Sequence, residues 1–240
     1  MKIAIVGMVG AASLVASADA GFLGFVASVR TSGAYKIIDI FAATTNASDK
    51  FLNVYDLNAV SSSGFYQQAG LATKTWKPDA AGFTSTRNAI DSFMTAGTFS
   101  GGAYGGEFYA STNTNGDPNF SGTSWNATPA SAAATTIPAL AGWYTGDPTS
   151  VDNNAESLAG LVGRVNMSGA AAANYGVWCA HLVVTSSTQS VSWQAFASIK
   201  DGVTGATSQA GSGAANIIPA PGAIALVGVA GLAAGRRRRA

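Results

Sequence analysis

The sequence has little charge: only 10% of its 240 residues are Asp, Glu, Lys or Arg, where about 25% is usual for a soluble domain. Five of the thirteen basic residues, Lys2 and Arg236 to Arg239, and one of the twelve acidic residues, Asp19, lie near the two ends. Residues 21–218 therefore hold eight basic and eleven acidic residues, a net charge of −3. Such a segment lacks the basic stripe that phosphate groups require, so we expect no nucleic-acid partner.

Cysteine and histidine are almost absent, since Cys179 and His181 are the only residues of their types. One cysteine cannot form an intramolecular disulfide, so the small disulfide-stapled folds are excluded and a hydrophobic core must stabilise the domain. One histidine with one cysteine cannot complete the usual structural zinc sites, and we expect no metal centre and no cofactor. Strand alternation places the two side chains on the same face, about 6 to 7 Å apart, which favours a structural pair over a catalytic dyad.

Glutamate is also rare, because Glu107 and Glu156 are the only two. Glycosidases need two carboxylates about 5 to 10 Å apart, and no spacing here brings two together, so a secreted polysaccharide-active enzyme is the second alternative. Asn and Asp alternate from Asn113 to Asn119 and offer the oxygen ligands that Ca²⁺ takes. No acidic residue occupies the twelfth position of an EF-hand loop, so calcium competes here with a plain Asx-rich turn.

The first twenty residues contain the three parts of a secretory signal peptide. Lys2 supplies a positive start, residues 3–16 form an apolar run of fourteen, and Ala18 and Ala20 have the A-x-A spacing that signal peptidase accepts. A membrane-spanning helix would need about 20 apolar residues. We therefore predict that residues 1–20 are a signal helix, that signal peptidase cleaves before Gly21, and that the protein is exported.

The last 22 residues, 219–240, contain a second ordered set of features. A proline motif comes first, formed by Pro219, Ala220, Pro221 and Gly222. An apolar segment of thirteen residues, 223–235, leads to a basic stop of Arg236, Arg237, Arg238 and Arg239. A helix of this length reaches only about 20 Å across a hydrocarbon core of about 30 Å. We predict a sorting signal that stays briefly in the membrane, with its arginines cytoplasmic, and is then removed; a permanent anchor or a tail that binds anionic surfaces are the alternatives.

The order of proline motif, apolar helix and arginine cluster resembles the PEP-CTERM sorting signal of bacterial exopolysaccharide-associated proteins. This resemblance implies processing by an exosortase-like membrane protease, transient contact with the inner membrane, and a final place on the cell surface or in the extracellular matrix, with exopolysaccharide as a candidate partner. Ala220 departs from the family, whose name-giving motif has Glu between the prolines. Residues 35–59 and 91–97 are also similar to a recurring type of PEP-CTERM protein, which implies a β-domain and no activity.

Residues 21–204 show alternation of period two and no long helical periodicity, a pattern typical of strands. The segment at residues 35–45 is apolar on both faces and is expected to be buried on both. The candidate strands lie at residues 23–30, 35–45, 50–60, 90–97, 106–112, 158–167, 175–185 and 190–200. Short strands with Gly, Asn, Asp and Ser connections predict an all-β domain, a single β-sandwich of jelly-roll or Greek-key type.

The connections differ in length. Residues 46–49 and 186–189 are short, so we expect the strands on either side of each to pair as a hairpin. Residues 113–135 and 145–155 are predicted to be long loops, which often carry binding surfaces. Residues 205–218, rich in Gly, Ser and Ala, are predicted to be a flexible linker.

Five tryptophans are available to stack on sugar rings. Trp178 and Trp193 lie in candidate strands and are expected in the core, whereas Trp125 and Trp143 lie in or beside the long loops and are the candidate stacking residues. Taken together, the sequence predicts an exported, non-catalytic β-domain of a bacterial envelope or matrix. The first alternative is a secreted carbohydrate- or calcium-binding module.

Overall fold

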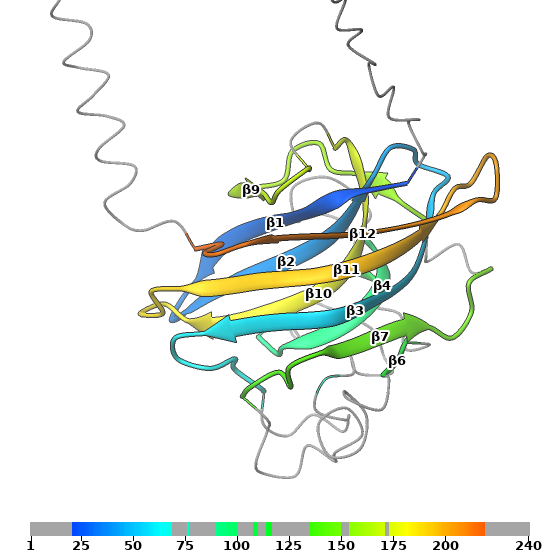
Figure 1. Cartoon of the computed structure of the whole chain (residues 1–240). Coiled ribbons are helices and arrows are strands. Elements are labelled where there is room, and N and C mark those ends of the chain that lie inside the picture. Colours follow the sequence, from blue (N-terminus) through cyan, green and yellow to red (C-terminus); the bar gives the residue numbers. More distant parts are fainter. Residues whose placement is uncertain are drawn as a thin grey trace, which may run out of the picture.

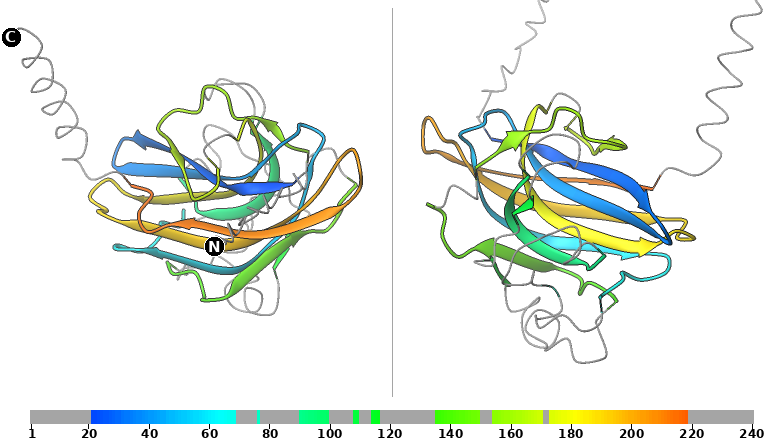
Figure 2. Two further views of the ribbon diagram at one scale, coloured as in Figure 1. Left: turned by 45° about the horizontal axis from the view of Figure 1, so that its top comes forward. Right: turned by 180° about the vertical axis from the view of Figure 1, so that it is seen from behind.

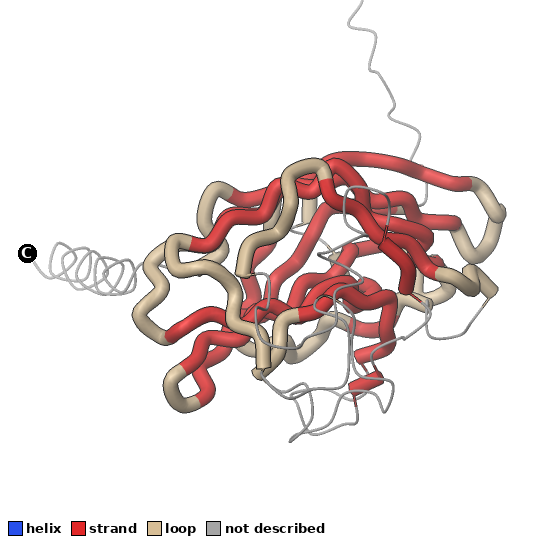
Figure 3. Tube along the Cα trace, turned by 90° about the horizontal axis from the view of Figure 1, so that it is seen from below, coloured by secondary structure: helices blue, strands red, loops and turns tan. Residues whose placement is uncertain are grey.

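A computed structural model describes residues 21–68, 76, 90–99, 108–109, 114–116, 135–149, 154–170 and 173–218. Within these ranges the chain forms strands, turns and loops and no helix (Figure 3). No helix in the described part is long and apolar enough to cross a membrane. The predicted signal and sorting helices lie outside the described residues, as do Ala18, Ala20, the proline motif at 219–222, the basic stop at 236–239 and Trp125.

The described strands form two antiparallel sheets (Figure 1). The first sheet has the order β5-β4-β10-β2-β1-β9, with β8 paired to β10. Its strands are β1 (Phe22–Ser32), β2 (Tyr35–Thr44), β4 (Phe93–Phe99), β5 (Phe108–Tyr109), β8 (Glu156–Ser157), β9 (Arg164–Asn166) and β10 (Tyr175–Thr185). The second sheet has the order β12-β11-β3-β7-β6, from β3 (Lys50–Ser61), β6 (Thr114–Gly116), β7 (Ala141–Thr145), β11 (Val191–Lys200) and β12 (Thr207–Ala214). The all-β prediction is therefore confirmed.

The two sheets form two layers with the main hydrophobic core between them (Figure 2). Alternation explains this core, because every second residue of β11, from Val191 to Ile199, points inward and is buried. The first sheet contributes residues such as Phe25, Ile40 and Leu182 to the same cluster. Residues 37–44 of β2 are buried on both faces, as the sequence predicts, because β2 also faces a second apolar cluster on its other side.

Both predicted hairpins are wrong. β2 pairs with β1 and β10, whereas β3 pairs with β11 and β7, so residues 45–49 cross from one sheet to the other. The chain crosses again between β10 and β11. Asp49 stabilises the first crossing: its Oδ2 accepts hydrogen bonds from the backbone N–H of Asn46 (3.1 Å) and the hydroxyl of Thr45 (3.2 Å). Its Oδ1 accepts one from the N–H of Gly202, 3.2 Å away in the turn between β11 and β12.

The predicted flexible linker at residues 205–218 is also wrong. β12 occupies most of this segment and pairs with β11 over eight positions, from Trp193–Ala214 to Lys200–Thr207. Ile217 and Ile218 follow it and are 0% and 2% exposed. Small side chains do not prevent strand formation here, because the backbone ladder to β11 holds β12 and the two isoleucines anchor its end in the core.

Two further predictions need correction. The strand expected at residues 158–167 shrinks to β9, since Gly160 and Gly163 adopt φ angles of 79° and 58° that end extended structure. The long loop expected at residues 113–135 contains β6, which pairs with β7. The other predicted strands are present with shifted ends.

Candidate functional site

The outer faces of the two sheets differ in how they are covered. On the first sheet, a second apolar cluster that includes Phe41, Phe93 and Trp178 lies beneath Leu158 and Ala170 of the segment between β8 and β10. On the second sheet, Asn58, Gln194 and Phe196 of the middle strands are exposed. In the described part of the chain, the first sheet therefore has a covered outer face and the second sheet has an exposed one.

Ser28, Asp39 and His181 form a row across β1, β2 and β10, because Ser28 is opposite Asp39 and Asp39 is opposite His181. All three are buried. A serine triad places histidine between serine and the acid so that histidine can take the hydroxyl proton. Here the acid lies in the middle, and the Ser28 hydroxyl donates instead to the carbonyl of Val162 at 2.7 Å. The row does not have the geometry of a catalytic triad.

His181 is held on every side by packing and charge. Its Nδ1 lies 2.5 Å from Oδ1 of Asp39, whose Oδ2 is 3.7 Å from a guanidinium nitrogen of Arg30. The imidazole stacks on Phe93 with ring centroids 5.0 Å apart and meets Trp178 edge-on at 5.8 Å. The hydrogen bond to His181 and the nearby guanidinium of Arg30 offset part of the cost of burying the Asp39 carboxylate, so this cluster is suited to fix β10, β2 and β1 in register.

Cys179 does not share a face with His181, contrary to the prediction. A bulge between Trp178 and Ala180 turns Cys179 into the core between the sheets, where its Sγ lies 3.3 Å from the carbonyl oxygen of Ile40. Burial raises the pKa of this thiol far above its ordinary value. A thiol that is neutral and enclosed cannot act as a nucleophile.

Of the two predicted stacking residues, Trp143 is in the wrong place for a ligand. It is 1% exposed, and its indole N–H donates to the backbone carbonyl of Thr95 at 3.1 Å. Its neighbour Tyr144 points the other way and is 45% exposed. Trp178 and Trp193 are buried, as predicted, and Trp125 lies outside the described residues.

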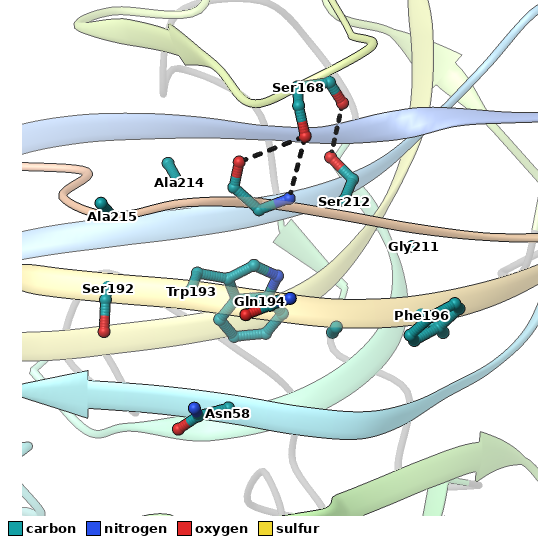
Figure 4. Close-up of a pocket in the computed structure, with 12 residues that line it drawn as sticks. Asn58, Ser168, Ser192, Trp193, Gln194, Phe196, Gly211, Ser212, Ala214 and Ala215 are labelled. Atoms are coloured by element: carbon teal, nitrogen blue, oxygen red, sulfur yellow. Dashed lines mark hydrogen bonds between the residues drawn. The ribbon is translucent and has the colours of Figure 1, made fainter.

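The outer face of the second sheet contains an open groove of about 600 Å³, which we call the sheet groove (Figure 4). It runs over β11 and β12, between Phe196 at one end and Ala215 at the other, with Ser168 beside it. None of its lining residues carries a charge: Asn58, Ser168, Ser192, Trp193, Gln194, Ala195, Phe196, Gly211, Ser212, Gly213, Ala214 and Ala215.

Two aromatic rings lie at the Phe196 end of the groove. Phe196, 40% exposed, stacks on Tyr55 with centroids 5.4 Å apart and planes 25° apart. The Tyr55 hydroxyl lies 3.2 Å from the amide oxygen of Gln209 and donates to it. Because β11 lies between Tyr55 on β3 and Gln209 on β12, the Tyr55 side chain must lie across β11, over a gap of about 10 Å. The hydrogen bond therefore holds the ring flat against the sheet.

Gly211 and Gly213 form the floor of the groove on β12. A Cβ at Gly211 would stand 2.9 Å from the Phe196 ring, and one at Gly213 would meet the carbonyl oxygen of Trp193. Gln194 lies next to Gly213 on one side and Asn58 on the other, and both amide side chains are exposed. Gly211 thus leaves room for the Phe196 ring to lie against β12, and Gly213 leaves room beside the two amides.

Sequence reasoning missed Tyr55, Asn58, Gln194 and Phe196. The alternation of 190–200 does separate inward Trp193, Ala195 and Ala197 from outward Gln194 and Phe196. The alternation does not show which strand lies beside β11, because the small and polar residues 205–218 predict a linker where the structure has β12. Gly21, the predicted first residue after cleavage, is buried just before β1.

A second hollow of about 400 Å³ lies at the far end of the same sheet, beside Lys50, Lys200 and the turn after β11. In this turn the carboxylate of Asp201 accepts hydrogen bonds from the backbone N–H groups of Thr204 (2.5 Å) and Val203 (2.7 Å). These bonds lower the pKa of Asp201, the one to Thr204 most strongly.

The described part of the chain has no group of three or more His, Cys, Asp or Glu side chains placed to hold a metal ion. Of the calcium candidates, Asn115 lies in β6, and Asn113, Asp117 and Asn119 are outside the described residues. Comparison with known proteins returned no match, whether to a family model, a curated protein or a solved structure.

Proposed function

We propose that this protein is exported to the surface or extracellular matrix of a bacterium, is cleaved at both ends, and functions there through a non-catalytic β-sandwich. Signal peptidase would act before Gly21, and an exosortase-like membrane protease near the proline motif at 219–222, after transient contact with the inner membrane. The remaining domain would carry the acidic net charge of residues 21–218.

The observation that carries the proposal is the position of the domain relative to the two predicted cleavage sites. β1 begins at Phe22, whose backbone N–H donates to the hydroxyl of Ser208 at 3.1 Å. At the other end, the N–H of Ile217 donates to the carbonyl of Val191 at 2.7 Å, and Ile218 is buried immediately before Pro219. Cleavage at both sites would leave every described core residue in the mature domain.

A Greek-key sandwich is the finer fold that we propose. The crossings from β2 to β3 and from β10 to β11 lie at opposite ends of the strands, because β2 is antiparallel to β10 and β3 is antiparallel to β11. Connections that pass between the two layers in this way are typical of Greek-key sandwiches.

The non-catalytic proposal rests on three reactive side chains in the described part of the chain. His181 is fully buried against Asp39 and Phe93, Ser28 donates to a backbone carbonyl, and Cys179 is a neutral thiol in the core. Each has a structural role that accounts for its position, which supports a binding or matrix function over hydrolysis.

Intact mass measurement of the protein released by its native host tests this proposal. We expect a mature N-terminus at Gly21 and a C-terminus within residues 219–222. Replacing Arg236 to Arg239 by alanine should prevent C-terminal cleavage and leave the N-terminus unchanged. Surface protein that retains residues 223–240, or that begins at Met1, would contradict the proposal.

A further inference from the structure

We propose that the sheet groove is a binding site for a neutral polysaccharide. This goes beyond export and sorting and does not depend on C-terminal processing, because the groove lies between Asn58 and Ala215. Four properties of the groove point to this ligand: its charge, its rings, its amides and its glycine floor.

The groove is neutral, which sets the charge of its ligand. The charged residue nearest to it in sequence is Asp56, which is exposed at the bulge of β3 between Tyr55 and Asn58 and does not line the groove. The basic residues Lys50 and Lys200 lie at the far end, opposite each other on β3 and β11. A nucleic acid or an anionic glycan gains most of its binding energy from basic residues, and none lines the groove. A neutral ligand does not need basic residues, so their absence does not weaken its binding.

The rings of Phe196 and Tyr55 provide an apolar platform. Both lie on the outer face, they are stacked 25° from parallel, and the hydrogen bond to Gln209 fixes the Tyr55 ring. A pyranose ring presents C–H groups on its flat faces, and such a face can bury apolar area against an aromatic ring. Pre-orientation of Tyr55 reduces the entropy lost on binding.

The amides of Gln194 and Asn58 provide the polar half of the site. They are opposite each other on β11 and β3, one step along the sheet from Phe196 and Tyr55, and both are exposed. Each carboxamide offers donors and an acceptor, the combination that vicinal hydroxyl groups require. The ring pair and the amide pair occupy neighbouring outward-facing positions along β11. This arrangement matches a chain of sugars, which presents apolar ring faces and hydroxyl groups at its edges.

The floor and the edge of the sheet favour a flat chain over a peptide strand. The Phe196 ring lies against the backbone at Gly211, and Gly213 adds no side chain of its own beside Gln194. A peptide could instead add to the edge of β12, but Ser168 and β1 occupy that edge: Ser168 N–H lies 3.3 Å from the Gly213 carbonyl, and Phe25 N–H donates to Ser212. Strand addition is therefore blocked beside the groove, at Ser212 and Gly213.

The test measures binding of the full chain to neutral glycans by isothermal titration calorimetry. The probes are hexasaccharides of β-1,4-glucose, β-1,4-xylose, β-1,4-mannose and α-1,4-glucose, with polygalacturonate as the anionic comparison. We expect at least one neutral probe to bind, with little change between about 0.05 M and about 0.5 M salt. Phe196→Ala should weaken this binding about tenfold or more.

Two further variants make the result specific. Gln194→Ala should also weaken binding. Because the side chains of Phe196 and Gln194 are exposed, Phe196→Ala and Gln194→Ala should both keep the thermal unfolding midpoint of the wild type. Val203→Ala is the matched control, an apolar residue 79% exposed in the turn after β11, and it should leave affinity unchanged. If Phe196→Ala unfolds the protein, the loss of affinity in Gln194→Ala decides alone.

Three results would overturn the proposal. The first is that none of the neutral probes binds. The second is binding that Phe196→Ala and Gln194→Ala leave intact. The third is binding of polygalacturonate alone, which salt abolishes, or a dimer in light scattering that Phe196→Ala dissociates, since either would assign the face to another partner.

Discussion

At the scale of single residues, Asp201 shows how one carboxylate closes the turn between β11 and β12. Its side chain accepts the backbone N–H groups of Val203 and Thr204, while its own backbone bonds to Ala206 and Gly205. An aspartate that caps a turn in this way satisfies donors that a short connection would leave unpaired. β12 depends on this turn to return alongside β11.

Asp201→Ala should therefore lower the thermal unfolding midpoint, and Asp201→Asn should lower it less, because asparagine keeps an acceptor oxygen. The lowered pKa of Asp201 in the folded state gives the pH dependence: its contribution is complete above the unfolded value, about 3.9, and is lost as pH falls through the lower folded value. Unfolding midpoints at pH 7 and at pH 2 to 3 measure this. A wild-type advantage over Asp201→Asn that persists unchanged at the acidic end would contradict the assignment.

Trp143 and Tyr144 show which part of the candidate site the sequence alone does not decide. Trp143 and Tyr144 are adjacent, and a strand points one inward and the other outward, so a shift of one residue decides which can stack on a ligand. The sequence places both beside a loop and favours the larger ring. The structure resolves the choice because Thr95 of the other sheet accepts the indole N–H of Trp143.

Among the elements, the segment between β8 and β9 contacts β1 of the first sheet. Gly163 has a φ of 58°, and a Cβ there would meet the carbonyl oxygen of Val29, whose N–H in turn donates to the Gly163 carbonyl at 3.1 Å. Gly160 has a φ of 79°, but a Cβ there would meet nothing within 4 Å. The two glycines share backbone strain and differ in their neighbours.

Gly160→Ala should cost about 1 kcal/mol of unfolding free energy, the strain of a left-handed residue. Gly163→Ala should cost about 3 kcal/mol or more, since the segment must also move away from β1. Urea denaturation of both variants measures the difference. Equal losses would mean that the segment does not rest on β1 as described.

The elements also show which parts of the fold a sequence can predict. Alternation places β2, β3, β10 and β11 within a residue or two, because burial of a strand depends on its own residues. Alternation cannot show whether two successive strands pair in one sheet or face each other across the core. A connection of four residues can close a hairpin or cross between the two layers. The hydrogen bonds of Asp49 to residues 45, 46 and 202 stabilise the crossing, and one of these partners is 153 positions away.

For the molecule as a whole, the folded domain extends to residue 218, although the composition of residues 205–218 predicts a linker outside it. Residues 205–218 carry few large side chains, so their pattern alone predicts no contact with the core. Their role comes from two residues at the end, Ile217 and Ile218, and from the ladder to β11. Full burial of two isoleucines contributes about 3 to 6 kcal/mol, a large share of the 5 to 15 kcal/mol of a typical domain.

We propose that residues 21–218 form one folded unit between two segments that are removed. Thermal unfolding of fragments 21–218 and 21–204, followed by circular dichroism beside the full chain, tests it most directly. We predict that 21–218 unfolds in one cooperative transition close to that of the full chain, whereas 21–204 is unfolded or melts far lower. An unfolded 21–218 fragment, or a 21–204 fragment as stable as the full chain, would show that the folded unit has other boundaries.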